Sequence, residues 1–469
     1  MGQAGRMVHD RLNHHAERMR GLLSITLLIG CVSATPAMAD EGPDWTPCAA
    51  DPRQECATVE VPRDYHRGEK ITLAISRIRT AKPETRRGVL LLIPGGPGNS
   101  GLYRPLTHGM RLPREVLDRY DLVGFDPRGV GRSTPITCGL TGDDAHPRHL
   151  QAWPGPGGDI TANVARAKRV AQACTRNELV RHITTRNEAR DIDQIRRALG
   201  ERKLSYWGVS YGTYVGAVYS TMFPDRVDRV VLDSSDDPDP RRVAYGWVNN
   251  FAIGVEDRFP DFAAWAAARA STYGLGDTPA AVRQTYLEMA EQVPDLRAYM
   301  FQGLYTDATF PLMAEYMRAA RAGDPLPSIP LPPPDQYQNL YAVLNATGCN
   351  DVAWPRSINR YAAAVAIDRL KYPLTGGMPQ NITACAFWPY PPAEPATRIA
   401  PSHKVLMIQN RRDPSTPYSA ALKMREALKA PMVSVDAGGH GAYFANGNTC
   451  GNDAVTAFLV HGTRVSKDC

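Results

Sequence analysis

Leu204-Ser-Tyr-Trp-Gly-Val-Ser-Tyr-Gly-Thr213 is the stretch of sequence that decides the fold. It predicts a short buried strand, a sharp turn with the pattern Gly-X-Ser-X-Gly, and a helix over about 213–223. Such a turn pushes the side chain of Ser210 out to where a base can reach it, and the first backbone N–H groups of the helix can hold an anion. Gly208 and Gly212 are small because strand and helix pass close to the turn. The pattern occurs by chance in many chains, so a nucleophilic serine needs support from the rest of the sequence.

The sequence on either side of this turn predicts a mostly parallel, doubly wound sheet. Continuous apolar runs are typical of strands that are buried on both faces, and they occur at 88–94, 120–126, 227–233 and 403–409. A shorter strand is expected at 432–435, and helices are expected at 187–199, 418–428 and 453–460. Strands that alternate with helices indicate a parallel sheet, and ligands bind such sheets at the carboxyl ends of the strands. Alternating apolar residues at 57–61 and 71–79 predict an antiparallel pair at the edge of the sheet.

The middle of the chain has a different character and predicts an inserted lid. It contains many prolines, no run typical of a buried strand, and helical patterns at 261–272, 280–292, 312–322 and 358–370. The proline-rich stretch 325–334 predicts an extended loop. We therefore expect an α/β core at 40–238 and 402–469, with a helical lid at 239–401 between its two parts.

Three polar residues fall at predicted strand ends in the order Ser210, Asp413, His440, which is the chain order of an α/β-hydrolase triad. Serine is a weak nucleophile at neutral pH, so a histidine must take its proton, and a carboxylate must hold the histidine in the right tautomer. Two other aspartates, Asp436 and Asp453, compete with Asp413 as the acid. Asp436 is too close to His440 along the chain to lie on a separate strand-end loop.

The oxyanion that forms during acyl transfer needs two backbone N–H donors. The residue after the nucleophile, Tyr211, supplies one donor in this kind of turn. We expect the second from Gly96 in the glycine-rich loop Gly95-Gly-Pro-Gly-Asn-Ser-Gly101, which follows a predicted buried strand. Asp126 also ends a predicted strand, and we expect it to brace the loop that follows rather than to take part in catalysis.

The N-terminus, residues 1–39, predicts an export signal. A basic segment ends at Arg20, an apolar stretch runs over 21–32, and Ala37-Met-Ala39 provides a cleavage site. The apolar stretch is too short to span a membrane. We expect a secreted protein, and the alternative is a cell-surface lipoprotein anchored at Cys31, because Leu28-Ile-Gly-Cys31 resembles a lipoprotein box.

The cysteines fit an exported protein. Eight of the nine lie beyond the predicted leader, at Cys48, Cys56, Cys138, Cys174, Cys349, Cys385, Cys450 and Cys469. An even number in an exported chain indicates disulfides, and the simplest arrangement pairs neighbours: 48–56, 138–174, 349–385 and 450–469. The sequence has no clustered Cys/His pattern, so we expect no metal and no cofactor. The formal net charge is only +6, without a Lys/Arg run, and this argues against nucleic acid as a partner. The oligomeric state stays open.

Several motifs together resemble one family. They are Gly95–Gly101, Gly124-Phe-Asp-Pro-Arg-Gly-Val-Gly-Arg-Ser-Thr-Pro135, Gly208–Thr213, Asp413-Pro-Ser-Thr-Pro417 and Gly439-His-Gly441. These motifs are similar to those of the secreted tripeptidyl aminopeptidases of actinobacteria, which are grouped with the prolyl aminopeptidases among the α/β-hydrolase peptidases. The resemblance covers most of the chain after the leader and is strongest outside the lid. It implies an exported serine exopeptidase that removes short peptides from free N-termini.

The resemblance also implies roles for single residues. It places nucleophile, acid and base on Ser210, Asp413 and His440, and it places the loop donor on Gly96. The sequence departs from the family at Pro94, where related enzymes often have a histidine, so a side-chain hydrogen bond from that position is missing.

An aminopeptidase must also bind a protonated α-amine, and we expect carboxylates of the lid to do so. Asp351 is the first candidate because it lies beside Cys349, and Glu256, Asp257 and Glu315 are the others. An ordinary helix-capping role for Asp351 is the alternative. The aromatic cluster at 387–390 would line the pocket or form the core of the lid.

Two other functions compete with the aminopeptidase. An esterase or amidase acting on small acyl substrates would use the same triad and would not need a free amine. A non-catalytic binding protein with this fold would have no need of Ser210, Asp413 and His440 together, so the complete triad argues against it. Epoxide hydrolases and haloalkane dehalogenases are disfavoured because they have aspartate at the position of the serine.

Overall fold

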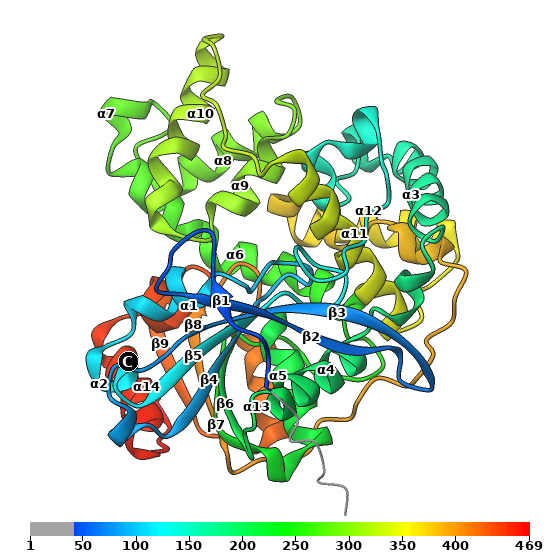
Figure 1. The fold of residues 1–469 in the computed structure, drawn as a ribbon. Helices are drawn as coiled ribbons and strands as arrows, with labels where there is room; N and C mark the ends of the chain where they lie inside the picture. The colour runs from blue at the N-terminus through cyan, green and yellow to red at the C-terminus, as the bar shows by residue number, and fades with distance from the viewer. Residues whose placement is uncertain (1–41) are drawn as a thin grey trace, which may run out of the picture. The chain divides into compact units, whose positions relative to one another are not determined.

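The computed structural model describes residues 42–469, which build a ten-stranded sheet with helices on both faces (Figure 1). The strand order is β1-β2-β3-β5-β4-β6-β7-β8-β9-β10. The predicted leader at 1–39, with its cleavage site after Ala39 and the alternative anchor at Cys31, lies outside the described residues.

The sheet is parallel from β5 to β10 and antiparallel over β1, β2, β3 and β5. The strands are β1 Thr46–Pro47, β2 Glu55–Asp64, β3 Arg67–Ile78, β4 Gly88–Ile93, β5 Tyr120–Phe125, β6 Leu204–Val209, β7 Val227–Asp233, β8 Val405–Arg412, β9 Met432–Gly438 and β10 Lys467–Asp468. This confirms the predicted mostly parallel sheet and the antiparallel pair toward one edge.

Helices cover both faces because successive side chains of a strand point to opposite sides. In β4, Leu91 and Ile93 pack in one hydrophobic cluster with residues of α4 Thr185–Ala198 and α5 Tyr211–Met222. Leu90 and Leu92 pack in another cluster with residues of α14 Thr449–His461. Helix α13 Tyr418–Leu428 contributes to the first cluster, and the short helix α2 Arg114–Leu117 contributes to the second. The apolar runs seen in the sequence are therefore strands buried on both faces.

Between β7 and β8 the regular elements are helical. They are α6 Tyr245–Ala267, α7 Ala270–Tyr273, α8 Pro279–Ala290, α9 Leu296–Gly303, α10 Phe310–Ala322, α11 Pro334–Asp351 and α12 Ile358–Lys371. The predicted helix at 261–272 is wrong in its start, because α6 begins at Tyr245 and continues through Pro260. Phe259 and Phe262 of this helix are buried among the lid side chains, and this packing outweighs the hydrogen bond that the proline cannot make. Helix α11 begins where the extended loop was predicted to end.

A segment outside the predicted lid packs with these helices. Helix α3 Thr161–Cys174 and the short turns before it follow β5, and Ile160 is buried with Tyr361, Val365 and Ile382 of the lid. Figure 1 shows α3 beside α11 and α12. The segment that precedes α3 therefore shares a hydrophobic cluster with residues of 239–401.

Four disulfides join neighbouring cysteines, and this confirms the simplest predicted pairing: Cys48–Cys56, Cys138–Cys174, Cys349–Cys385 and Cys450–Cys469. The second ties the end of α3 to the loop after β5, and the third ties α11 to the turn at Ala384–Phe387. Within residues 42–469, no helix combines the length and the hydropathy that a membrane span requires.

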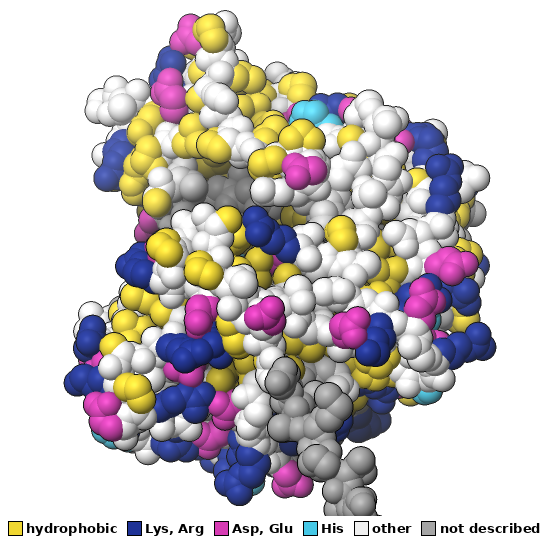
Figure 2. All heavy atoms as spheres, viewed as in Figure 1, with side chains coloured by type: hydrophobic (Ala, Val, Ile, Leu, Met, Phe, Trp, Pro, Cys, Tyr) yellow, Lys and Arg dark blue, Asp and Glu magenta, His cyan; other side chains and the backbone are white. Residues whose placement is uncertain are grey.

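The surface carries charges of both signs. On the face shown in Figure 2, Lys/Arg and Asp/Glu side chains are interspersed, and a hollow opens below the helices α8 and α10. No continuous basic stripe crosses this face, in keeping with the modest net charge of the chain.

Candidate active site

Ser210 occupies the tight turn between β6 and α5. Its backbone has φ 60° and ψ −129°, a region that non-glycine residues rarely occupy and that costs about 1–3 kcal/mol. The strained backbone is held in place by close packing around the turn. A Cβ at Gly212, for example, would lie 2.7 Å from the carbonyl oxygen of Pro94. The N–H of Ser210 donates to the carbonyl of Asp233 at the end of β7 (3.0 Å). The turn thus presents the serine hydroxyl at the carboxyl edge of the sheet.

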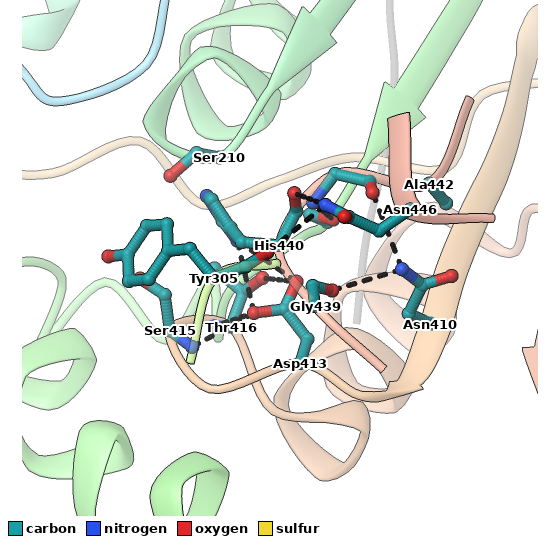
Figure 3. Close-up of polar contacts among 12 residues, drawn as sticks. Ser210, Tyr305, Asn410, Asp413, Ser415, Thr416, Gly439, His440, Ala442 and Asn446 are labelled. Atoms are coloured by element: carbon teal, nitrogen blue, oxygen red, sulfur yellow. Dashed lines mark hydrogen bonds and ion pairs between the residues drawn. The ribbon is translucent and has the colours of Figure 1, made fainter. Parts of the chain in front are cut away.

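His440 and Asp413 meet at the same edge, after β9 and β8. Both carboxylate oxygens of Asp413 lie 3.0 Å from Nδ1 of His440. Asp413 is fully buried, and its oxygens also accept from the N–H groups of Ser415 and Thr416 and from the Thr416 hydroxyl, each at 2.9 Å. Figure 3 shows the imidazole of His440 between Ser210 and Asp413. The carboxylate therefore holds one ring nitrogen and leaves the other toward the serine.

The charges of this pair stabilise each other. Burial by itself would raise the pKa of Asp413, but the charge and hydrogen bond of His440 and the N–H donors of Thr416 and Ser415 hold that pKa below its usual value. Burial by itself would lower the pKa of His440, but the attraction of Asp413 raises that pKa above its usual value, with smaller contributions from Asp233 and Asp236. The arrangement favours an imidazolium once the histidine has taken a proton.

Tyr305, which follows α9 in the lid, fixes the backbone of the histidine. Its carbonyl accepts from the N–H of His440 (2.9 Å), and its ring meets the imidazole edge-on with the ring centroids 5.0 Å apart. Asn446 donates to the carbonyl of His440 (2.7 Å) and to that of Tyr305 (3.1 Å), as Figure 3 shows. Sequence reasoning missed both residues, because nothing local marks a lid carbonyl as a partner of the histidine loop.

The glycine-rich loop after β4 lies against the serine. A Cβ at Gly95 would lie 2.9 Å from Cβ of Ser210, so only glycine allows this approach. Gly96 and Tyr211, the two predicted oxyanion donors, border the same cavity as Ser210 and His440. The structure thus brings together all five residues that the sequence assigned to the triad and the oxyanion hole.

Asp126 has the bracing role that the sequence predicted. One carboxylate oxygen accepts from the Ser100 hydroxyl (2.5 Å) and from the N–H groups of Gly101 and Leu102 (3.1 Å each), and the other accepts from the N–H of Arg132 (2.8 Å). It therefore ties the glycine-rich loop to the loop after β5. Among the rival acids, Asp436 is exposed and pairs with Arg412 instead of a histidine.

A cavity of about 420 Å³ opens above Ser210. Core and lid both line it, with Val248 and Phe251 from α6, Leu340 and Leu344 from α11, and the turns at 378 and 382–385. The segment around α3 contributes 149–152, Asn163, Arg166 and Ala167, which sequence reasoning did not connect with the site. The volume is within the range of pockets that enclose small ligands.

The carboxylates that were expected to bind the amine do not border this cavity. Asp351 is buried and accepts from the N–H (2.9 Å) and hydroxyl (2.5 Å) of Thr185. Glu256 and Glu315 are neutralised by Arg283 and Arg318. Asp257 and the aromatic cluster at 387–390 are also absent from the cavity lining. The side chain of Trp388 is buried and donates to Asn350 (2.8 Å), so it belongs to the lid core.

A buried polar network lies behind the oxyanion loop. The hydroxyl of Tyr211 donates to Oε2 of Glu188 (3.0 Å) and bonds to the hydroxyl of Thr185 (2.8 Å). The other oxygen of Glu188 has no partner among the described residues. Burial raises the pKa of Glu188 to about 8, with repulsion from Asp191 and Asp351 in addition. A pKa of about 8 favours the neutral form of this glutamate at pH 7.

The described residues contain no group of three His, Cys, Asp or Glu side chains placed to hold a metal ion. The arrangement of Ser210, His440 and Asp413 fits acyl transfer by a serine nucleophile.

Comparisons with known proteins identify the family. The family model described as TAP-like protein matches residues 373–469. The tripeptidyl aminopeptidase of Streptomyces lividans is 34% identical over 477 residues, covering 94% of this chain and 88% of the relative. The chain belongs to the tripeptidyl aminopeptidase family. It is a serine hydrolase with the α/β-hydrolase fold, as the motifs predicted.

Other proteins similar to this chain have other names. The serine protease Hip1 of Mycobacterium tuberculosis is 30% identical, covering 93% of this chain and 94% of the relative. The carboxylesterase B of the same organism is also 30% identical, covering 87% of this chain and 84% of the relative. Among solved structures, an esterase from Thermogutta terrifontis is 16% identical with a TM-score of 0.36, covering 82% of this chain and 91% of the other.

Proposed function

We propose that this protein is an exported serine aminopeptidase that releases tripeptides or shorter peptides from free N-termini. The observation that carries the proposal is the pair of 3.0 Å contacts between Asp413 and Nδ1 of His440, beside the strained turn of Ser210. The names of the Streptomyces relatives support the peptide product, and the cavity of about 420 Å³ above Ser210 supports a short acyl segment.

The reaction follows from the positions of the side chains. His440 takes the proton of the Ser210 hydroxyl as the oxygen attacks the scissile carbonyl, and Asp413 stabilises the imidazolium that forms. The backbone N–H groups of Gly96 and Tyr211 bind the oxyanion, and the loss of one such donor costs about 3–4 kcal/mol of barrier. The imidazolium then gives its proton to the leaving amine. Water, activated by the same histidine, releases the acyl segment from the serine.

Substrate panels test this proposal. Peptide anilides with one, two or three residues and a free N-terminus are compared with their N-acetylated forms and with a p-nitrophenyl ester. We expect free peptides to be preferred, and the released length follows from the panel. A preference for blocked peptides or esters would favour an esterase. This is the second candidate function, because one of the relatives is named carboxylesterase B. Ser210→Ala should remove nearly all turnover with unchanged circular dichroism, and near-wild-type turnover would exclude Ser210 as the nucleophile.

Export is proposed from the leader at 1–39 and from the four disulfides, since disulfides persist in oxidising compartments. Mass spectrometry of the mature protein distinguishes the two predicted forms. A chain beginning at Asp40 indicates secretion, whereas a lipid-modified chain beginning at Cys31 indicates anchoring at the cell surface. A full-length chain that stays in the cytoplasm would contradict both.

A further inference from the structure

The cavity above Ser210 contains a carboxylate that the mechanism does not use. Of the described residues that line this cavity, Asp236 alone is acidic. The basic side chains in the lining are Arg104, Arg166, His149 and His440, and the two arginines would repel an ammonium group. The negative charge of the cavity is therefore concentrated at one place.

The fold sets Asp236 beside the nucleophile. Strands β6 and β7 are neighbours in the sheet, and Val209 is in register with Asp233. Ser210 follows the first of these strands by one residue, and Asp236 follows the second by three. Because parallel neighbouring strands end at the same edge about 5 Å apart, both residues follow the same edge of the sheet, and both line the cavity.

The hydrogen bonds of Asp236 leave one of its oxygens open to a ligand. Oδ1 accepts from Nδ2 of Asn250 (2.7 Å) and from the N–H of Asp237 (2.8 Å). Oδ2 accepts no hydrogen bond from residues 42–469, although the side chain is only 8% exposed. The neighbouring carboxylate of Asp237 differs, because Lys423 neutralises it at 2.7 Å.

Asp236 has no arginine or lysine partner among residues 42–469. It forms no ion pair with Arg or Lys within 4 Å, and burial, with repulsion from Asp237 and Asp413, raises its pKa to about 7. A carboxylate that is nearly buried without a counter-ion is costly, and a bound cation removes that cost. A ligand that brings its own positive charge therefore complements this position.

We propose that Asp236 binds the protonated α-amine of the peptide substrate and so determines the preference for free N-termini. The proposal rests on the aminopeptidase function proposed above. The open Oδ2 accepts a charge-assisted hydrogen bond from the ammonium, and Asn250 holds the carboxylate in place. Asp351, Glu256 and Glu315 are not required for this step, because none of them borders the cavity.

The test compares Asp236→Asn with Asp237→Asn. Asparagine at 236 can keep both bonds at Oδ1 and places an NH₂ group where the open oxygen was. The measured quantity is the ratio of kcat/KM for a free peptide anilide to kcat/KM for its N-acetylated form. A hydrogen bond to a charged group contributes about 1.5–3 kcal/mol, so we expect Asp236→Asn to lower this ratio about 10- to 100-fold. Asp237→Asn, an adjacent acid outside the cavity, should leave the ratio unchanged.

Asp236→Glu extends the test if the asparagine variant folds poorly. It keeps the charge at the end of a longer side chain, and we expect it to retain a clear preference for the free peptide. An unchanged ratio in Asp236→Asn, or equal loss of the ratio in Asp236→Asn and Asp236→Glu, would overturn the role of Asp236. A wild-type enzyme that does not prefer free peptides would instead refute the aminopeptidase function itself, so the two failures are distinguishable.

Discussion

Replacing Glu188 with glutamine should make the protein more stable than the wild type as the pH rises. Glu188 is 5% exposed, lies on α4 behind the oxyanion loop, and accepts from the Tyr211 hydroxyl through Oε2, while Oε1 has no partner. Glutamine has the same shape, and its carbonyl oxygen can accept the same hydrogen bond. The change therefore removes the ionisation and little else.

The magnitude follows from the pKa of the buried carboxyl. That pKa is raised from 4.5 to about 8, chiefly by burial. In the unfolded chain the glutamate ionises near pH 4.5, whereas in the folded protein it stays protonated until about pH 8. Its contribution to stability is therefore complete below pH 4.5 and is lost as the pH rises to 8. At about 1.4 kcal/mol for each pKa unit, the loss is on the order of 5 kcal/mol. Glu188→Gln does not suffer this loss.

The change in stability is measured by urea unfolding at pH 4.5, 6 and 8 with the disulfides intact. Tryptophan fluorescence and circular dichroism follow the unfolding. We expect the difference in unfolding free energy between Glu188→Gln and wild type to grow in favour of the variant by several kcal/mol over this range. If the new NH₂ group of the glutamine costs a fixed free energy of folding, this cost shifts the whole plot of that difference against pH without changing its slope. A difference that does not change with pH would refute the conclusion that Glu188 is buried and neutral.

Glu394→Gln is the matched control, since Glu394 is ion-paired. Arg190 and Arg186 contact its carboxylate at 2.5 and 2.9 Å, and the hydrogen bond from Arg190 lowers its pKa most. A lowered pKa contributes stability above the unfolded value and loses it as the pH falls through the folded value. Because this window lies below pH 4.5, the difference in unfolding free energy between Glu394→Gln and wild type should stay nearly constant from pH 4.5 to 8, whereas that of Glu188→Gln should grow.

Two further predictions concern the catalytic turn and its base. Gly212→Ala should abolish most turnover and destabilise the fold, because its Cβ would lie 2.7 Å from a backbone carbonyl oxygen of the loop after β4; full activity and an unchanged melting temperature would contradict this packing. His440 must be neutral to accept a proton, and Asp413 raises its pKa, so kcat/KM for an uncharged ester should rise with pH through a midpoint above the usual histidine value. A midpoint at or below that value, measured by a pH–rate profile, would argue against the stabilising contact.

Much of the core could be predicted because its signals are local. The buried strands β4, β5, β6, β7 and β8 each form an apolar run bounded by polar or glycine residues, and their alternation with helices specifies a parallel sheet. The order of Ser210, Asp413 and His440 then places three side chains at one edge, since parallel strands share their carboxyl ends. Neighbouring cysteines also paired as expected, because each pair lies in one local unit of the fold.

The lid and its charges were predicted less well because they depend on contacts between distant segments. Helix α6 passes through Pro260, and the segment around α3 packs against side chains about 200 residues away in the chain. The carbonyl of Tyr305 holds His440 across 135 residues, a distance that no local pattern reveals. Composition predicts a helical middle segment, but the packing of its helices decides where each begins and what it touches.

By itself, the sequence predicted a nucleophilic turn at Ser210, two partners at later strand ends, Asp413 and His440, and the kind of sheet that carries them. Only the tertiary structure decided which acidic side chains face the cavity. In the sequence, three acidic residues were good candidates for binding the amine: Asp351, Glu256 and Glu315. In the folded protein each has another partner, which is Thr185 for Asp351, Arg283 for Glu256 and Arg318 for Glu315. Burial and charge pairing are properties of the folded protein, because they depend on which segments meet in space.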